Sequence, residues 1–313
     1  MESYFKFAER GTNLRTEVLA GITTFMTMAY IIFVNPGILS AIFGDAALEW
    51  IPALVTATTL GAALMCITMG IVSNRPLALA SGMGLNAVVA FGIVIGAGVP
   101  WQVGMAVVFV EGLIILALVM TGLREAVMNA IPLNLKRSIG VGIGLFITFI
   151  GLKGGGIVVA NEATLVSLGD FAQPTVWVAL IGLVATFAFI ALRVKGDILW
   201  GILIAAAAAL LFNVTSLPTA VFAAPDFRTF FAPFQTPEGT SSIALFQVFT
   251  PMLLLFVFSL MLTDFFDTMG TVVAVGEQAD FVDAEGKIPG IRGILAVDSI
   301  AAAIGGLFGA SSI

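Results

Sequence analysis

The sequence contains no histidine, and this absence excludes several kinds of chemistry. Without histidine, the 313-residue chain cannot form a His-ligated zinc site, a Ser-His-Asp triad or a His-ligated haem. Its single cysteine, Cys66, lies in an apolar run, so an internal disulfide and a cysteine-based metal site are also excluded. Lysine and arginine number 13 against 19 acidic residues and form no basic block, so nucleic acid is not an expected partner.

Charged residues are scarce as well, at 10% of the chain, whereas soluble domains carry about 25%. Hydrophobic residues make up 59%, and the mean hydropathy is +1.11. Repeated apolar runs of about 20 residues predict a polytopic helical membrane protein. The apolar segments fall at about 18–36, 52–72, 86–97, 102–122, 138–152, 175–192, 198–213, 248–276 and 291–309.

The distribution of lysine and arginine predicts the orientation in the membrane. If the N-terminus is cytoplasmic and the short third segment crosses, all but Lys153 and Arg228 fall on the cytoplasmic side. The cytoplasmic set is Lys6, Arg10, Arg15, Arg75, Arg124, Lys136, Arg137, Arg193, Lys195, Lys287 and Arg292. We expect residues 1–17 in the cytoplasm and loop 214–245 outside, partly as an interfacial helix, with a flexible outer turn at 151–157.

The third apolar segment is interrupted. It reads RPLALASGMGLNAVVAF from Arg75, where Pro76 favours an extended start and the glycines break any helix until about Asn86. Irregular backbone is tolerated at membrane depth only where it is buried in protein or lines a cavity. The free N–H groups of such a half-helix bind polar substrates in several transporter folds. A helical hairpin with an irregular loop is the alternative.

A weak internal echo accompanies this interruption. GAALMCITMGIVSNRPLALASGM and DSIAAAIGGLFGASSI both pass from a small-residue helix through a glycine-containing turn to a short polar segment. Paired interruptions of this kind indicate a repeated transporter architecture.

Two acids stand out in the eighth segment, within TDFFDTMGT. Between Phe246 and Gly276, Asp264 and Asp267 are the only formally charged residues. An ionised acid near the bilayer centre costs roughly 2.5 kcal/mol or more, so we expect both to face the interior. Three residues apart on a helix, they lie on one face. The alternative is that they hydrogen-bond neighbouring helices, which is also the role we expect for Asp298.

Four motifs in order, FMTMAYIIFVNPGIL, ASGMGLNA, FFDTMGT and GLFGASS, carry a resemblance to a known family. From about Phe5 to the last residue the chain resembles the AzgA-like purine permeases. These are nucleobase–cation symporters that transport adenine, guanine and hypoxanthine. The resemblance implies an all-α polytopic membrane protein with a UraA-like fold. That fold is a seven-plus-seven inverted repeat with short strands in segments 3 and 10.

The resemblance also implies a domain organisation. The chain would hold segments 1–4 of the core (transport) domain at 18–122 and part of the gate domain, segments 5–7, at 123–213. An extracytoplasmic loop would follow at 214–245, and the core would resume at 246–313 with segments 8–9 and the start of 10. The family's remaining segments are missing here, so the sequence reads as truncated. A homodimer through the gate domain is implied.

The implied function is proton-coupled purine uptake across the bacterial inner membrane by elevator-type alternating access. No cofactor is expected apart from the proton as coupling ion. Asp267 of the Asp-Thr-x-Gly-Thr element and Asn86 are the implied substrate contacts, while Asp264 and Asp267 are the expected proton carriers. The full expected substrate set is Asp267, Asn86, Gly82, Met83, Gly84, Leu85, Thr24, Phe25 and Thr271.

Three other functions remain open from the residues alone. A relative with the same fold would transport a pyrimidine or an anion, although two inward acids disfavour an anion. A non-transporting fragment is the second. A membrane-embedded enzyme is the third, but intramembrane aspartyl proteases place their acids on two helices, whereas these two share one. We therefore expect a transporter and not an enzyme.

Overall fold

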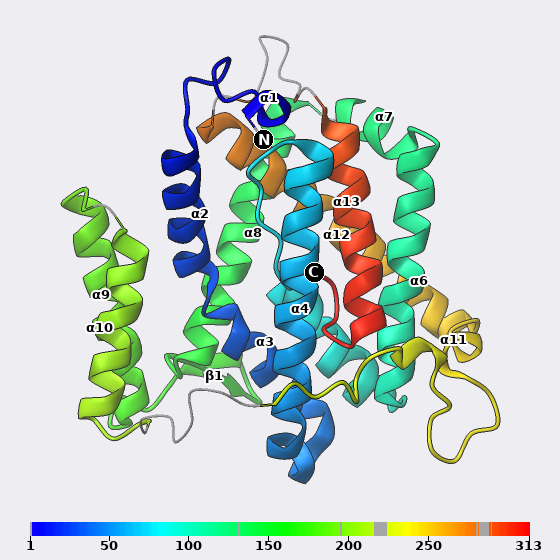
Figure 1. Cartoon of the computed structure of the whole chain (residues 1–313). Coiled ribbons are helices and arrows are strands. Elements are labelled where there is room, and N and C mark those ends of the chain that lie inside the picture. The colour runs from blue at the N-terminus through cyan, green and yellow to red at the C-terminus, as the bar shows by residue number, and fades with distance from the viewer. Residues whose placement is uncertain are drawn as a thin grey trace. The chain divides into compact units, whose positions relative to one another are not determined.

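The computed structural model describes residues 2–130, 132–194, 196–215, 224–279, 281, 288 and 290–313. These residues form mainly helices (Figure 1). The first half contains α1 Glu2–Phe5, α2 Leu14–Met28, α3 Ile31–Ser40, η1 Ala41–Ala46, α4 Ala47–Ser73, α5 Met83–Ala87, η2 Val88–Gly96, α6 Trp101–Met120 and α7 Leu123–Ala130. The second half contains α8 Leu133–Gly154, β1 Val158–Asn161, β2 Leu165–Leu168, α9 Pro174–Ala191, α10 Asp197–Leu211, η3 Ala232–Phe234, α11 Ala244–Gln247, α12 Pro251–Gln278 and α13 Ile291–Phe308.

The helices confirm the apolar pattern of the sequence. From the second apolar segment onward, each predicted run matches a helix to within about five residues at either end. The first run is divided between α2 and α3. By length and composition, the stretches able to cross a membrane are Leu14–Ser73, Trp101–Met120, Pro174–Ala191, Pro251–Gln278 and Ile291–Phe308, with Met83–Gly96 and Asp197–Leu211 as shorter apolar helices.

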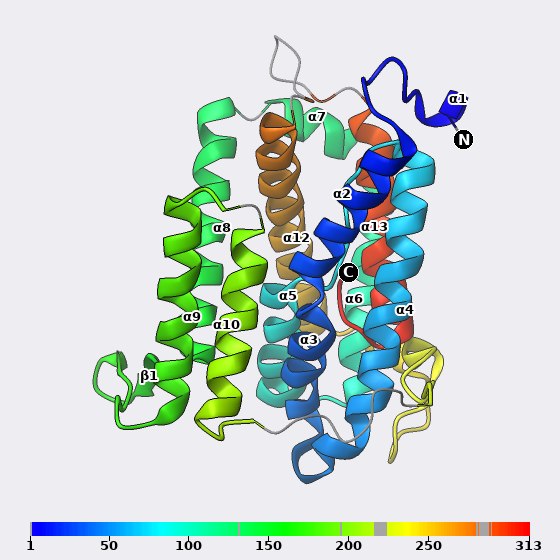
Figure 2. The same cartoon turned by 60° about the vertical axis from the view of Figure 1, so that its left-hand side comes forward.

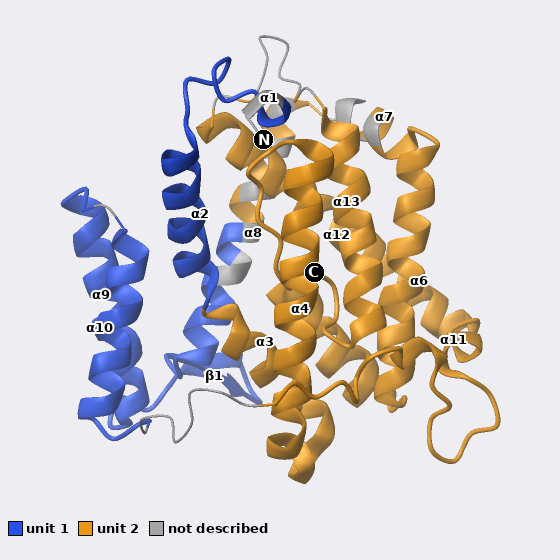
Figure 3. Ribbon diagram, viewed as in Figure 1, with its two compact units in different colours: residues 1–29, 144–223 blue, residues 30–143, 224–313 orange. Residues whose placement is uncertain are grey.

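The chain divides into two compact units, coloured separately in Figure 3. The first unit comprises residues 1–29 and 144–223, and the second comprises 30–143 and 224–313. The expected transport and gate domains have different boundaries, drawn from the family resemblance, and they stay a prediction.

In the first unit, α9 and α10 pack against each other through small residues. A Cβ atom added at Gly182 of α9 would lie 2.7 Å from Cβ of Ala205 in α10, so the two backbones approach too closely for a larger residue. Between α8 and α9, β1 and β2 form an antiparallel hairpin with Val158 opposite Leu168. The prediction of a flexible turn at 151–157 is wrong for residues 151–154, because α8 continues to Gly154.

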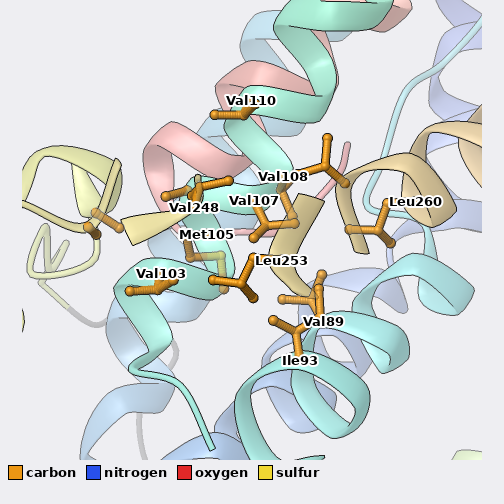
Figure 4. Packing of buried hydrophobic residues seen from close by; sticks show 14 of the residues in the cluster. Val89, Ile93, Val103, Met105, Val107, Val108, Val110, Val248, Leu253 and Leu260 are labelled. Carbon is orange, nitrogen blue, oxygen red and sulfur yellow. The ribbon is translucent and has the colours of Figure 1, made fainter. Parts of the chain in front are cut away.

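In the second unit, a buried apolar cluster joins α6 to η2 and α12. Figure 4 shows Val89 and Ile93 of η2 near Leu253 of α12, with Val107 of α6 beside them. These side chains are at most 5% exposed. Burying each one contributes roughly 1.5–3 kcal/mol relative to water, which fixes the interrupted segment against two long helices.

Helices α6 and α13 approach each other through glycines. A Cβ at Gly306 of α13 would lie 2.6 Å from the backbone nitrogen of Phe109 and 2.8 Å from the carbonyl oxygen of Met105, both in α6. A Cβ at Gly112 of α6 would lie 2.9 Å from Cα of Ala303. Small residues let membrane helices pack this closely. The acidic residues that α6 and α13 carry are therefore held close together.

The segment before α12 contains less helix than predicted. Within its described part, only η3 and the four-residue α11 are helical, and residues 216–223 of the expected loop lie outside the described residues. Arg228, expected outside, donates to the carboxylates of Glu49 at 2.9 Å and Asp226 at 2.8 Å. Its guanidinium also lies 4.8 Å from the ring centre of Trp50. These hydrogen bonds, with Glu49 the larger contributor, raise the pKa of Arg228.

Candidate functional site

The interrupted segment lies beside the end of the chain. Residues 76–82 run without helix from α4 to α5, and the Gly82 backbone N–H donates to the carbonyl oxygen of Ser312 at 3.1 Å. The Ser81 hydroxyl donates to the carbonyl oxygen of Ala310 at 3.4 Å. The tail containing Ala310 follows α13, whose C-cap residue Gly309 has φ of +82°, and it lies beside α4 in Figures 1 and 2. The two echoed interruptions of the sequence therefore meet.

The meeting is not a β-ladder. The short strand implied for segment 3 is absent from the described residues 76–82, which hold one backbone hydrogen bond to the tail where a ladder needs several. Side chains make up the rest of the contact.

Asn35 of α3 is the centre of these side-chain contacts, and sequence reasoning missed it. Its side chain is fully buried, and its Nδ2 lies 3.1 Å from the Ala310 carbonyl oxygen, 2.8 Å from Thr58 Oγ1 and 3.2 Å from Ser81 Oγ. The Thr58 hydroxyl donates to its own helix, so its oxygen accepts from Asn35. Asn35 stands in the NPG motif of the first segment, where a polar amide inside an apolar run was the available signal.

These contacts fix the orientation of Asn86. A carbonyl oxygen can only accept, so Ala310 requires that Asn35 point its amide NH₂ toward the tail. The Oδ1 atom of Asn35 then faces Asn86 and accepts from its Nδ2. The Oδ1 atom of Asn86 is left buried with no partner among the described residues. An unpaired buried acceptor is costly, roughly 1–3 kcal/mol, which marks it as a position for a donor from a ligand.

Asp267 faces the same break. Its Oδ2 lies 3.9 Å from the position that a Cβ on Gly82 would occupy, and its side chain is half-buried. Within the described part of the chain, its carboxylate accepts no hydrogen bond, which leaves its lone pairs available.

The other expected site residues fall into two groups, those on or near the interrupted segment and those in the first unit. Met83, Gly84 and Leu85 form the first turn of the apolar helix Met83–Gly96, where backbone N–H groups lack an acceptor within their own helix. Thr271 follows Asp267 by one turn and is exposed. Thr24 and Phe25 belong to the first unit, where the Thr24 hydroxyl donates to Ala20 of its own helix at 3.0 Å and the Phe25 side chain is exposed. Their part in the site stays a prediction.

Asp264 is engaged by an arginine. The Arg124 guanidinium Nη2 lies 3.6 Å from Asp264 Oδ2 and 3.0 Å from Asp298 Oδ2. The Thr268 hydroxyl also donates to Asp298 Oδ2, at 2.9 Å. The expectation that Asp298 joins helices is confirmed. Arg124, which the sequence assigned only to the cytoplasmic side, is buried: 2% of it is exposed, and from α7 its side chain contacts these carboxylates.

Glu111 is a fourth charged residue of this region. It lies on α6, is 1% exposed, and is close enough to Arg124, Asp264 and Asp298 to interact with them electrostatically. Sequence reasoning missed it, although an isolated acid in the apolar run WQVGMAVVFVEGLIILALVM is the same signal that identified Asp264. In the described part of the chain, no group of three or more Asp, Glu or Cys side chains is arranged to hold a metal ion.

Comparison with known proteins identifies the family of the chain. Residues 15–313 match the model of a family described as the permease family. The guanine/hypoxanthine permease PbuG of Bacillus subtilis (strain 168) is 40% identical over 100% of this chain and 70% of its own length. The adenine permease AdeP of Escherichia coli (strain K12) is 37% identical over 100% of this chain and 67% of its own length. A second guanine/hypoxanthine permease of B. subtilis, PbuO, is 37% identical over 98% of the chain and 69% of its own length.

These relatives are named as transporters and not as enzymes, and the identity extends along the whole chain. The chain spans about 70% of the length of PbuG. With a family match over all but its first 14 residues, this helical membrane protein belongs to the permease family.

Proposed function

We propose that the protein carries purine nucleobases across the membrane. The observation that supports this most directly is the pair of acceptors beside the helix break, Asn86 Oδ1 and the Asp267 carboxylate, neither of which has a hydrogen-bond donor among the described residues. The names of relatives, guanine/hypoxanthine permease and adenine permease, support a purine as the cargo.

The polarity of the site suits such a ligand. Purines carry ring and exocyclic N–H donors, which Asn86 Oδ1 and the Asp267 carboxylate are free to accept. They also carry ring-nitrogen and carbonyl acceptors, which the N–H groups of Met83 to Leu85 are free to serve. In this scheme Asn35 is a positioning residue, because it holds the Asn86 amide in the orientation that presents its oxygen. An anionic cargo is disfavoured by two acceptors, one of them charged.

We further propose that uptake is proton-coupled, with the proton as the only coupling ion. Burial favours the neutral form of a carboxylic acid. The half-buried Asp267 is therefore suited to take up a proton on the outer side of the membrane and to release it on the inner side. Asp264 is the second carrier in this scheme, and its ionised form is stabilised by Arg124. Alternating access by an elevator-type movement of residues 18–122 and 246–313 past the gate segments 123–213 completes the proposal.

The setting of this activity is also proposed. We infer a bacterial inner membrane, a cytoplasmic N-terminus and a homodimer formed through the gate segments. Ten of the eleven cations assigned to the cytoplasmic side still support that orientation after Arg124 is set aside as a buried residue.

A same-fold transporter of pyrimidines is the remaining alternative. Pyrimidines offer a similar row of donors and acceptors on a single ring. Competition against radiolabelled hypoxanthine uptake separates the two: adenine, guanine and hypoxanthine should compete, and uracil should not.

The substrate role of Asp267 is tested by Asp267→Asn in cells and in proteoliposomes. The variant should reach the membrane at the wild-type level and lose purine uptake, because an amide replaces one acceptor oxygen with a donor and cannot carry the proton. Gly82→Ala is a second probe, since an added Cβ meets no atom closer than 3.5 Å yet lies 3.9 Å from Asp267 Oδ2. It should fold normally and raise the KM for hypoxanthine.

Asp45→Asn is the matched control, because Asp45 is exposed and lies in η1, outside the proposed substrate set. It should transport like wild type. Wild-type uptake by Asp267→Asn would remove that residue from the site.

A further inference from the structure

A buried charged cluster lies next to the proposed substrate site and contains more acid than base. Its members are Glu111 on α6, Arg124 on α7, Asp264 on α12 and Asp298 on α13. If all four were ionised, one positive and three negative charges would leave a net charge of −2. Buried charges persist only where they are paired and hydrogen-bonded.

Arg124 is committed mainly to Asp298. Its Nη2 donates to Asp298 Oδ2 at 3.0 Å, and its Nη1 donates to the hydroxyl of Ser299 at 2.7 Å. Thr268 supplies Asp298 with a further donor. Asp298 therefore has the partners that an ionised carboxylate needs, and Asp264 has only the longer 3.6 Å contact.

Glu111 lacks partners of this kind. Its Oε1 is buried and has no hydrogen-bond partner in the described part of the chain. The neighbouring Gly112 packs directly on the α13 backbone at Ala303, which closes that side of α6 to a larger residue. Among the described residues, Arg124, Asp264 and Asp298 are the charged groups that interact electrostatically with Glu111, and two of these three repel its ionised form. Burial without a partner therefore disfavours an ionised Glu111 much more strongly than a neutral carboxyl group.

We propose that Glu111 is a proton-binding site, separate from Asp267. Glu111 is protonated in the arrangement of this structure, in which Arg124 is paired with Asp298. The step is Glu–COOH to Glu–COO⁻ plus H⁺. The carboxylate left behind is stabilised when Arg124 moves toward it, and the proton leaves to water on the side then open.

This inference rests on the proposed function in one respect, its link to substrate. Asp267 is close enough to Asp298 to be affected by its charge, and it lies one helical turn beyond Asp264 on α12. Each negative charge added to the cluster disfavours the ionised Asp267 that accepts purine N–H groups. Protonation of Glu111 therefore favours purine binding, and the two ligands bind together, as symport requires.

Infrared spectroscopy of the purified protein in liposomes tests the proton directly. A carboxylic-acid C=O band should be present at neutral pH, shift when the glutamates carry ¹³C, and disappear in Glu111→Gln. The isotope shift identifies a glutamate without any mutation, and Glu111 is the only buried glutamate in the described part of the chain. Glu49→Gln, an exposed matched control, should keep the band. A wild-type spectrum with no glutamate-sensitive acid band would overturn the proposal.

The link to substrate is tested by hypoxanthine binding between pH 6 and 8. The wild-type Kd should rise with pH as Glu111 loses its proton, whereas Glu111→Gln, which mimics the neutral acid, should lose this rise and keep only the contribution of Asp267. An unchanged pH dependence in Glu111→Gln would refute the link. If wild type binds no purine, the proposed function fails, and the infrared result still decides whether Glu111 holds the proton.

Discussion

Replacing Arg124 with glutamine removes the only described positive charge from the buried cluster, and the structure sets the size of the effect. The guanidinium lies 3.0 Å from Asp298 and 3.6 Å from Asp264, with side-chain exposures of 1%, 14% and 9% for the three residues. At an effective dielectric constant near 20, these separations correspond to gross attractions of about 5 kcal/mol each. The cost of desolvating the arginine offsets much of this. Removing one partner from a buried pair typically destabilises by about 3–5 kcal/mol, which is the loss of unfolding free energy we expect.

The measurement is the free energy of unfolding of the purified protein, obtained by titrating detergent-solubilised protein with SDS. Arg228→Gln is the matched control, because Arg228 also contacts two carboxylates but is exposed, and exposed pairs contribute little. The double variant Arg124→Gln/Asp298→Asn should be more stable than the sum of the single changes predicts, since Asp298→Asn removes the carboxylate that would otherwise be left unpaired.

If Arg124→Gln lost no more stability than Arg228→Gln, the cluster would not be charged as described. The charge count behind the proton on Glu111 would then be wrong as well.

Two further predictions concern packing and polarity. Asn35→Asp should lower the unfolding free energy by about 1–3 kcal/mol and raise the Kd for hypoxanthine, because aspartate cannot donate to the Ala310 carbonyl and no longer orients Asn86. The same change at the exposed helix cap Asn13, where aspartate caps equally well, should change neither quantity. Gly306→Ala should lower the unfolding free energy in the SDS titration by about 1–3 kcal/mol, because its Cβ would clash with α6. Gly70→Ala, whose Cβ would meet no atom within 4 Å, should be neutral or slightly stabilising, and equal results at the two glycines would refute close α6–α13 packing.

Much of the fold was predictable because apolar runs in a membrane have few alternatives to helix. The interruption at 76–82 was predictable for the same reason, since proline and glycine there cannot continue a helix. The β1–β2 hairpin was not predicted, because two four-residue strands such as those in VVANEATLVSL carry little signal against the long apolar segments around them.

Prediction of the site was limited by information that a single segment does not contain. Asp267 and Gly82 were both identified from the sequence. Their distance from each other, however, depends on how α12 packs against α5, which neither segment shows by itself. Arg124 was predicted only to lie on the cytoplasmic side, because its contacts with Asp298 and Asp264 are tertiary and leave no signal in its own segment. The role of Asn35 depends on a tail that follows it by 275 residues.

That last separation has a consequence for how the protein is made. Ribosomes add roughly 5–20 residues per second, so about 14–55 s pass between synthesis of Asn35 and synthesis of Ala310, its carbonyl partner. During this interval the Asn35 amide can donate to the hydroxyls of Thr58 and Ser81, but it lacks the Ala310 carbonyl that fixes its orientation. The contact that fixes the Asn35 amide, and through it Asn86, can therefore form only after α13 and residue 310 have been made, long after α3 and α4 have met.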